Sequence, residues 1–379
     1  KMKTKIAAAI ALSVLAGSTF AAPTFYGEVD ATIDYLPENN ANTADRDVVE
    51  LSSNNSFIGL KGEEKLTDRL SALYQAEFTF YVDDGENGTD VFVPRNLLVG
   101  LKDEKLGALK AGKIDTPVKQ LSAIVDTFNN YIENSADVHG ILAGENRIDN
   151  VLVYETPAFK IGTGKLEAKA LLATGEGDTI KATKGGTKVA GRGLGDSWST
   201  SVTYTDNLFV VGLGYDKAIP SRFNGKGFLN ATSTENTVAL NQTIEADTIR
   251  AIGRLNLDNG LSLRALYQTS DVGRPSANPA TATLANTIDD AQGWLLGAEY
   301  NLPTAKAWTV KAQYSQNTTA FKSNAVDTND FEAKQILAGL DYAFNKQVKA
   351  YGYAGYLTLE QGSKEDKQPV LGTGLEYRF

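Results

Sequence analysis

The sequence contains no cysteine, one histidine and one methionine in 379 residues. Without cysteine, disulfides and thiolate-based metal or redox sites are excluded. A single histidine, His139, removes most of the nucleophile–base arrangements that hydrolases use. After residue 21 there is also no apolar run of the length that a membrane-spanning helix requires. These absences argue against most enzymes and against helical membrane proteins.

Charge adds a further restriction. The net charge is −9 at pH 7, and 22% of the residues are charged. This charged fraction is typical of an ordinary folded protein rather than a disordered one. An acidic chain argues against nucleic acid as a partner. No cluster of metal-ligand residues stands out, so we predict neither a metal nor a cofactor.

The first 21 residues have the features of a secretory signal peptide. Three lysines at positions 1, 3 and 5 precede a short apolar run at 6–16, and small residues follow up to Ala21. The apolar run is too short to cross a bilayer. We therefore expect cleavage after Ala21 and an exported chain, 22–379, that forms one domain.

Alternation of apolar and polar residues with a period of two dominates the rest of the sequence. In the stretch FYGEVDATIDY, Phe25, Val29 and Ile33 share one face, whereas Glu28 and Asp30 share the other. Short turns alternate with long polar connections such as 37–54, 175–196, 217–243 and 271–290. We predict sixteen strands, at 24–36, 55–64, 69–81, 92–102, 107–114, 147–157, 164–174, 197–205, 208–216, 244–257, 260–270, 291–302, 305–316, 332–344, 347–359 and 369–379.

This rhythm of connections distinguishes two all-β folds. A soluble sandwich would not need long loops all at one end. An outer-membrane barrel combines an even number of strands, short periplasmic turns and long external loops with an apolar outside and a polar lumen. Its sheet must close, because an open edge in lipid leaves backbone groups unpaired. We predict a 16-stranded antiparallel transmembrane β-barrel, whose lumen is too wide for side chains to fill.

Several motifs resemble the Gram-negative general porins of the neisserial and β-proteobacterial type. They are FYGEVDATIDY, SFIGLKGEEKLTDRLSALYQAEF, PRNLLVGLKDEKLGALKAGKIDTP, NRIDNVLVYETPAF and the closing LGTGLEYRF. The resemblance implies a homotrimer in the outer membrane, in contact with lipid and lipopolysaccharide. It also implies that the third loop, about 115–146, folds inward and narrows the channel. The function implied is passive diffusion of small hydrophilic solutes and ions.

The resemblance also suggests functional positions. Arg95 and Arg147 match the basic residues that line the wall of the family's channels, and Lys113 lies where the family usually has arginine. Asp126 and Glu133 are the expected acidic residues of the loop. The closing aromatics, Phe379 and Tyr377, match the signal that the barrel-assembly machinery recognises.

Two departures from the family pattern affect the charge of the wall. Phe57 replaces an arginine of the second strand, and Glu28 stands where related porins often carry a base. Both changes make the wall less basic, so the sign of ion selectivity stays open.

The alternation itself predicts further pore-lining charges. Glu28 and Asp30 occupy the polar face of the first strand, and Arg250, Arg254 and Arg264 occupy the polar face of the tenth and eleventh. These strands lie on opposite sides of a 16-stranded ring. We therefore expect an acidic-to-basic polarity across the channel, which would order water and select solutes.

Three other functions are weighed against a general channel. An enzyme is disfavoured because the lone His139 lies in the long third loop, away from any strand face. A substrate-selective channel for small charged solutes remains the main alternative, since the three arginines could serve acidic solutes. A structural or adhesive role through the external loops is the third.

Overall fold

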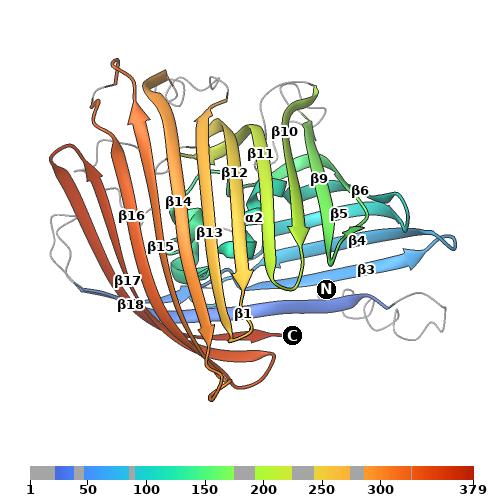
Figure 1. Ribbon diagram of the computed structural model, residues 1–379, viewed down its shortest axis with the longest axis horizontal. Helices are drawn as coiled ribbons and strands as arrows, with labels where there is room; N and C mark the ends of the chain where they lie inside the picture. The colour runs from blue at the N-terminus through green and yellow to red at the C-terminus, as the bar shows by residue number, and fades with distance from the viewer. Residues whose placement is uncertain are drawn as a thin grey trace, which may run out of the picture.

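The computed structural model describes residues 22–37, 47–84, 90–174, 193–223, 243–273, 286–325 and 327–379. The predicted signal peptide lies outside these residues, as do residues 175–192 of the long connection predicted at 175–196. The described chain is an antiparallel sheet that closes into a ring, with short helices inside it (Figure 1). Among these residues, no helix is both long and apolar enough to span a membrane.

The sheet has eighteen strand segments. They are β1 (Thr24–Leu36), β2 (Val48–Ser53), β3 (Phe57–Lys65), β4 (Leu70–Thr79), β5 (Val93–Asp103), β6 (Gly107–Asp115), β7 (Arg147–Glu155), β8 (Phe159–Ile161), β9 (Gly164–Thr174), β10 (Leu194–Thr205), β11 (Phe209–Arg222), β12 (Thr243–Asn256), β13 (Leu261–Val272), β14 (Ile288–Asn301), β15 (Trp308–Phe321), β16 (Phe331–Ala343), β17 (Val348–Gln361) and β18 (Lys364–Arg378).

These segments form sixteen barrel strands, as predicted. The two segments β2 and β3 pair with successive parts of β1, so together they form one interrupted strand. In the same way, β7 and β8 both pair with β9. The ring closes where β1 pairs with β18, from Glu28 opposite Arg378 to Tyr35 opposite Leu371. The predicted fold class is confirmed.

Several strands are longer than predicted at their external ends. The last strand begins at Lys364 instead of residue 369, and only Gly362 and Ser363 separate β17 from β18. Likewise, β11 continues to Arg222 past a register shift between Asp216 and Ile219. The added part of β18, Lys364–Gln368, is polar on both faces, so it lacks the alternation on which the predicted boundaries rest. The added part of β11 contains the buried Ala218 and Ile219 and lies beyond the register shift, where the alternation is interrupted.

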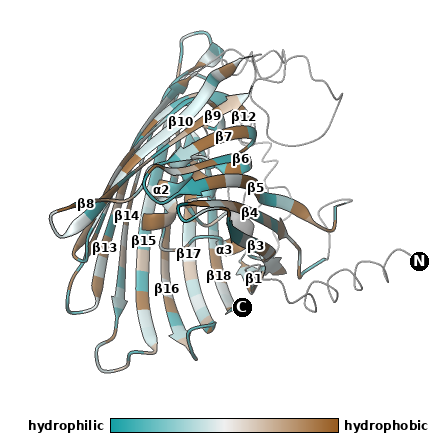
Figure 2. Cartoon of the chain, turned by 90° about the vertical axis from the view of Figure 1, so that its right-hand side faces the viewer, coloured by the Kyte–Doolittle hydropathy of each residue, from teal (hydrophilic) through white to brown (hydrophobic). Residues whose placement is uncertain are grey.

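Hydrophilic and hydrophobic residues alternate along the strands of the wall (Figure 2). Outward aromatic side chains form two belts. Tyr267 lies opposite Trp294, whose ring centroid is 4.9 Å from that of Tyr314. Nearer the short turns, the Trp308 and Tyr342 rings are 4.8 Å apart. The inward faces of the same strands carry polar residues, among them Gln268, Gln313, Ser315 and Gln335. This pattern is typical of a membrane barrel with a wet lumen.

The third loop connects β6 to β7 and contains α2 (Pro117–Val125), α3 (Tyr131–Asn134) and α4 (Val138–Ile141). Thr116 caps α2 by accepting a hydrogen bond from the Lys119 amide, 3.1 Å away, and proline occupies the first turn. The apolar stripe Val118, Leu121 and Val125 is buried. Since α2 contacts β10 to β13, the loop lies inside the ring, and its predicted inward fold is confirmed.

Candidate functional site

Arg250 fastens the third loop to the inner wall. Its side chain rises from β12 and is fully buried, with 0% exposure. Its guanidinium donates hydrogen bonds to the Val118 carbonyl at 3.1 Å and to the Ala143 carbonyl at 2.6 Å. It also forms an ion pair with Glu145 and donates to Gln268. The prediction that Arg250 lines the pore is therefore wrong, because the folded loop covers it completely.

Arg254 and Arg264 hold the far end of α2. The Arg254 guanidinium lies 3.4 Å from the Ile124 carbonyl, and that of Arg264 lies 3.4 Å from the Asp126 carbonyl. Arg264 also pairs with Glu299. Free carbonyls at the C-terminus of a helix carry partial negative charge, so cations there are stabilising. The two arginines thus face the loop main chain, although part of each remains accessible.

The predicted loop acids do not form a free acidic edge. Asp126 is buried, and its carboxyl accepts hydrogen bonds from Gln313 Nε2 at 3.0 Å and from the Val138 amide at 3.1 Å. It thus points toward the wall rather than the opening, which corrects its predicted pore-lining position. The Glu133 side chain lies outside the described part of the structure.

Burial changes the protonation of two loop carboxyls. Asp137 begins α4 and accepts hydrogen bonds from the Gly140 and Asn130 amides, each at 3.1 Å. Burial, followed by the nearby charge of Asp126, raises the pKa of Asp137 to about 8. Burial likewise raises the pKa of Asp126. At neutral pH the pair therefore retains a proton that the two residues would release in water.

The raised pKa of Asp137 predicts that the third loop is held less firmly at high pH. Because the folded-state pKa of Asp137 is raised, its stabilising contribution is present at low pH and is lost as the pH rises from about 4 toward 8. We expect a protease to cleave the third loop faster at pH 9 than at pH 6 in the wild type. Asp137→Asn should remove most of this difference, whereas the exposed control Asp327→Asn should preserve it. An equal pH response in all three proteins would contradict the assignment.

Aromatic contacts hold the middle of the loop. The Tyr131 ring stacks on Tyr351 of β17 with centroids 4.6 Å apart. Lys311 donates to the Tyr131 hydroxyl at 2.5 Å. The Tyr351 hydroxyl in turn donates to Asp30, which is 1% exposed. Asp30 faces inward as predicted, but the stacked rings cover it, so the prediction that it lines open water is wrong.

Below the loop, the inner wall from β15 to β1 carries a chain of alternating charges. Its successive ion pairs join Lys311 to Asp341 at 3.0 Å, Asp341 to Lys349 at 3.8 Å, Lys349 to Glu376 at 2.7 Å, Glu376 to Arg378 at 2.8 Å and Arg378 to Glu28 at 2.9 Å. Glu28 thus lies on the inner wall as predicted, but it is paired. Because each charge has an opposite neighbour, this wall contributes little net field.

The opposite side of the lumen presents a different surface. Between Thr116 and Asn146, the accessible side chains that the structure describes are Lys119, Gln120, Ala123, Ile124, Asn129, Asn130, His139 and Asn146. These eight described residues include no acid. Asn130 reaches the wall, where it accepts a hydrogen bond from Asn55 Nδ2 at 2.9 Å. The described part of the loop therefore offers amides, one ammonium group, one imidazole and apolar atoms to a passing solute.

Arg95 reaches the lumen through a β-bulge. Two residues of β5, Arg95 and Asn96, lie opposite the single residue Glu77 of β4. Beyond the bulge, Val99 is 64% exposed on the outside. Arg95 lies 3.9 Å from Glu77 and 4.6 Å above the Phe57 ring. An extra residue shifts the alternation by one, which explains how an inward arginine precedes outward aliphatic residues.

Arg147 joins the same wall network. Its guanidinium lies 3.1 Å from Asp115 and donates to Asn96 Oδ1 at 3.2 Å. Lys119 of α2 approaches Asp115 as well, at 3.1 Å. The structure thus brings Arg147 and Arg95 together at the start of the loop, on either side of Asn96.

Lys113 faces outward, in contrast to its predicted place in the pore. It lies opposite Leu97, in a cross-strand row that continues through Ala76 to Leu60, which is 40% exposed. Directly opposed residues share a face of a sheet. Its partner is Asp149, 2.9 Å away. Plain alternation along β6 accounts for this face, because Leu109, which is 53% exposed, and Lys113 are four residues apart on the same strand.

The period-two alternation of polarity in the sequence did not identify several charged residues of this inner wall. Lys110 lies 2.6 Å and Lys169 lies 3.9 Å from Glu155. Glu77 and Asp115 carry the other wall carboxylates. The spacing of Asp115 and Lys119, four residues apart across a helix start, is a signal that could have identified one pair.

Comparisons with known proteins agree with this geometry. The sequence model described as Gram-negative porin matches residues 7–362. The chain is 23% identical to a major outer membrane protein of Neisseria sicca, with 98% of each chain covered. Its fold is similar to the solved anion-selective porin from Comamonas acidovorans, with a TM-score of 0.65, 21% identity and coverage of 94% and 99%. It is also similar to a trimer form of OmpT from Vibrio cholerae, with a TM-score of 0.59, 16% identity and coverage of 94% and 99%.

The predicted resemblance is therefore confirmed over most of the sequence. Members of this family are channels rather than enzymes, and the closed barrel with its polar lumen fits that role. The chain belongs to the Gram-negative porins, the outer-membrane channels through which small hydrophilic solutes diffuse passively.

Proposed function

We propose that the narrowest passage lies between the accessible face of the third loop and the wall from β3 to β9, and that it favours small anions. The supporting observation is an excess of cations among the described residues there. Five basic side chains, Arg95, Lys110, Lys119, Arg147 and Lys169, share three carboxylates, Glu77, Asp115 and Glu155.

The orientation of the loop acids supports the same preference. Asp126, Asp137 and Glu145 are buried within the loop or against the wall, so their charges are directed away from the passage. A fixed excess of positive charge in a narrow passage raises the local concentration of anions. The printed name of the Comamonas structure, an anion-selective porin, is consistent with this proposal.

The test is the reversal potential of single channels under a potassium chloride gradient. Removing both wall arginines, Arg95→Ala with Arg147→Ala, should lower the permeability ratio of chloride to potassium. A unit charge at 4 Å contributes about 1 kcal/mol in water, so we expect a change of about fivefold or more. The control is Lys367→Gln, which removes a charge from the exposed outer surface. An unchanged ratio in the arginine variant would show that these residues do not control the path.

The same recordings distinguish a general channel from a substrate-selective one. For a general channel, we expect small anions of several classes to lower the current only in proportion to their size. Saturable block by one class of acidic solute would instead favour the selective alternative.

We also propose that three chains assemble side by side, as in the trimer form of OmpT to which the fold is similar. The outward pair Lys113 and Asp149 supports contact with protein in this part of the wall. Charged residues on the lipid face of a barrel are destabilising. The proposal also places lipopolysaccharide around the trimer. It further states that the barrel-assembly machinery recognises Phe379 and Tyr377.

A further inference from the structure

One carboxylate of the inner wall is buried behind the start of α2 without a compensating group. Asp216 of β11 is 0% exposed, and neither of its carboxylate oxygens has a hydrogen-bond partner within the described part of the structure. The hydroxyl of Ser197 on β10 is also 0% exposed and has no partner among the same residues. Burying a charge is costly unless another group compensates for it. Asp216 therefore needs a further group beside it.

The basic side chains close to Asp216 are engaged elsewhere. Arg250 lies one inward position further along β12 than the residue that faces Asp216. A guanidinium has five N–H groups, and Arg250 donates all of them to Gln268 and to oxygens of the third loop. Lys217, the next residue of β11, belongs to the outer face and pairs with Asp247. Neither cation therefore neutralises Asp216.

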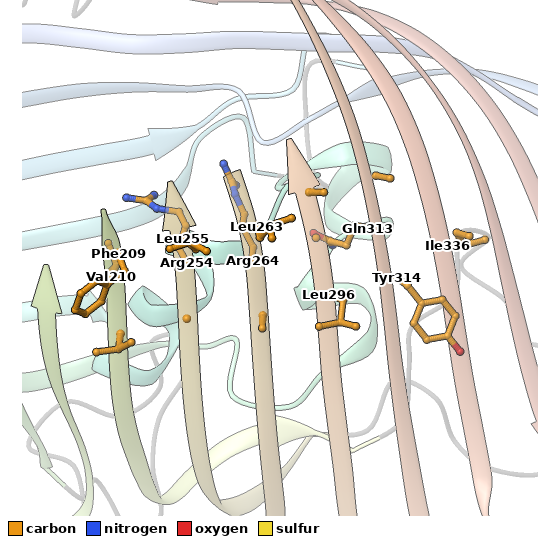
Figure 3. A pocket seen from close by; sticks show the side chains of 16 residues that line it. Phe209, Val210, Arg254, Leu255, Leu263, Arg264, Leu296, Gln313, Tyr314 and Ile336 are labelled. Carbon is orange, nitrogen blue, oxygen red and sulfur yellow. The ribbon is translucent and has the colours of Figure 1, made fainter. Parts of the chain in front are cut away.

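The other two arginines of β12 and β13 are too far away. Figure 3 shows the outer surface of these strands, from which the side chains of Arg254 and Arg264 point away. Arg254 lies opposite Arg264, and it is six residues along β12 from Thr248, which faces Asp216. A strand rises about 3.3 Å per residue, so this level of the wall is about 20 Å from Asp216.

Buried hydroxyl groups lie on both sides of the carboxylate. Ser199 of β10, whose hydroxyl is close to the carboxylate, and Thr248 of β12 lie directly opposite Asp216. Directly opposed residues share a face of the sheet, with Cβ atoms about 5 Å apart. Thr248 shares a hydrogen bond of 2.9 Å with Ser270, and Ser197 lies one inward position beyond Ser199. Asp216 therefore lies within a row of buried hydroxyl oxygens.

We propose that Asp216, together with the hydroxyls of Ser197, Ser199 and Thr248, binds a monovalent metal cation, sodium or potassium, between the wall and the third loop. Hard cations take oxygen ligands, and each hydroxyl oxygen has lone pairs available for this purpose. Ser199 also accepts a hydrogen bond from the Val118 amide, 3.3 Å away, in the first turn of α2. The cation thus holds in place the wall groups on which the loop rests.

The local charge favours a monovalent over a divalent cation. The positive charge of Arg250 is balanced by Glu145, so Asp216 leaves one negative charge without compensation. A monovalent cation restores neutrality, whereas a divalent cation would bury an excess positive charge. A proton on Asp216 is the other way to reach neutrality. Only a metal cation makes the protein respond to the identity of the salt.

Protection of the third loop against a protease measures this response. The full-length protein, folded in detergent, is digested at neutral pH in mixtures of sodium or potassium chloride with choline chloride at constant ionic strength. Asp216→Asn keeps the volume of the side chain and removes its charge, whereas Ser197→Ala removes one ligand oxygen. Asp258→Asn, which changes an exposed carboxylate in a short turn, is the matched control.

At a sodium or potassium concentration ten times the dissociation constant, we expect cleavage of the wild type to be about tenfold slower than in choline chloride. Asp258→Asn should respond in the same way, and Ser197→Ala should need a higher concentration. Asp216→Asn should be cleaved at one rate in all three salts, which also controls for effects of salt on the protease. Equal cleavage of the wild type in all three salts would overturn the proposal, because a proton or water would then compensate Asp216. Protection by calcium chloride alone would overturn it as well.

Discussion

Replacing Arg250 with alanine is expected to release the third loop from the barrel wall and to enlarge the channel without preventing barrel formation. The side chain supplies hydrogen bonds to both ends of the loop, at Val118 and Ala143, and neutralises Glu145. Removing one partner of a buried ion pair typically costs 3–5 kcal/mol, because the other charge is left without compensation. The barrel seam between β1 and β18 does not involve this residue, so the ring should still close.

Single-channel recording and limited proteolysis measure this release. Arg250→Ala should show higher and more variable conductance, and faster cleavage within 116–146. The double variant Arg250→Met with Glu145→Gln removes both charges while keeping volume, so it should restore much of the loop's protection. Arg69→Ala, which removes an exposed arginine at a short turn, is the matched control. Wild-type conductance and protection in Arg250→Ala would refute the fastening role.

A second large effect is expected at the seam of the barrel, where Gly27→Ala should impair closure. The backbones of Gly27 and Phe379 exchange two hydrogen bonds, of 3.0 and 3.1 Å. A Cβ at Gly27 would lie 2.5 Å from the Phe57 carbonyl oxygen and 2.6 Å from the Phe379 ring. The ring could rotate, but the carbonyl belongs to the neighbouring strand and could move only by displacing it. Overpacking of this kind costs about 1–3 kcal/mol or more.

The yield of folded barrel in outer-membrane fractions, judged by heat-dependent mobility on gels, tests this effect. We expect a large loss for Gly27→Ala. Gly352→Ala is the control, because a Cβ there would come no closer than 3.8 Å to another atom. Phe379→Ala should lower the yield as well, and any barrel that still inserts should conduct like the wild type. A normal yield for Gly27→Ala would show that the seam tolerates the added methyl group.

The fold could be predicted from the sequence because one rule applies to every strand. In a barrel with lipid outside and water inside, side-chain polarity must alternate, and the short turns mark each reversal. The rule also identified correctly that Arg250, Arg254 and Arg264 point inward. It could not show whether an inward residue meets water or another part of the chain. That depends on the path of the third loop, which packs against strands far away in sequence.

The remaining error comes from transferring a family position to this chain. Lys113 was assigned to the pore by counting along the family motif, but alternation along β6 places it on the outward face with Leu109, which is 53% exposed. A register shift lies beside Lys113, where β7 has one residue more than β6. Two local signals mark this shift, since Gly112 has a φ of 146° and Asn150, on the facing strand, has a φ of 56°. Glycine and asparagine tolerate such angles far better than other residues. Neither residue type is specific enough to locate a bulge without the paired strand.

The third loop has two chemically separate faces, and this separation has a consequence for how such channels diversify. The residues that fasten it, such as Leu121 and Glu145, are buried, whereas Ala123 and Asn129 are exposed. Exposed substitutions away from such fastenings usually change stability by no more than about 0.5 kcal/mol. Inherited changes on the accessible face could therefore alter which nutrients and antibiotics enter the cell while the barrel keeps its strength, so that permeability and robustness are free to vary independently.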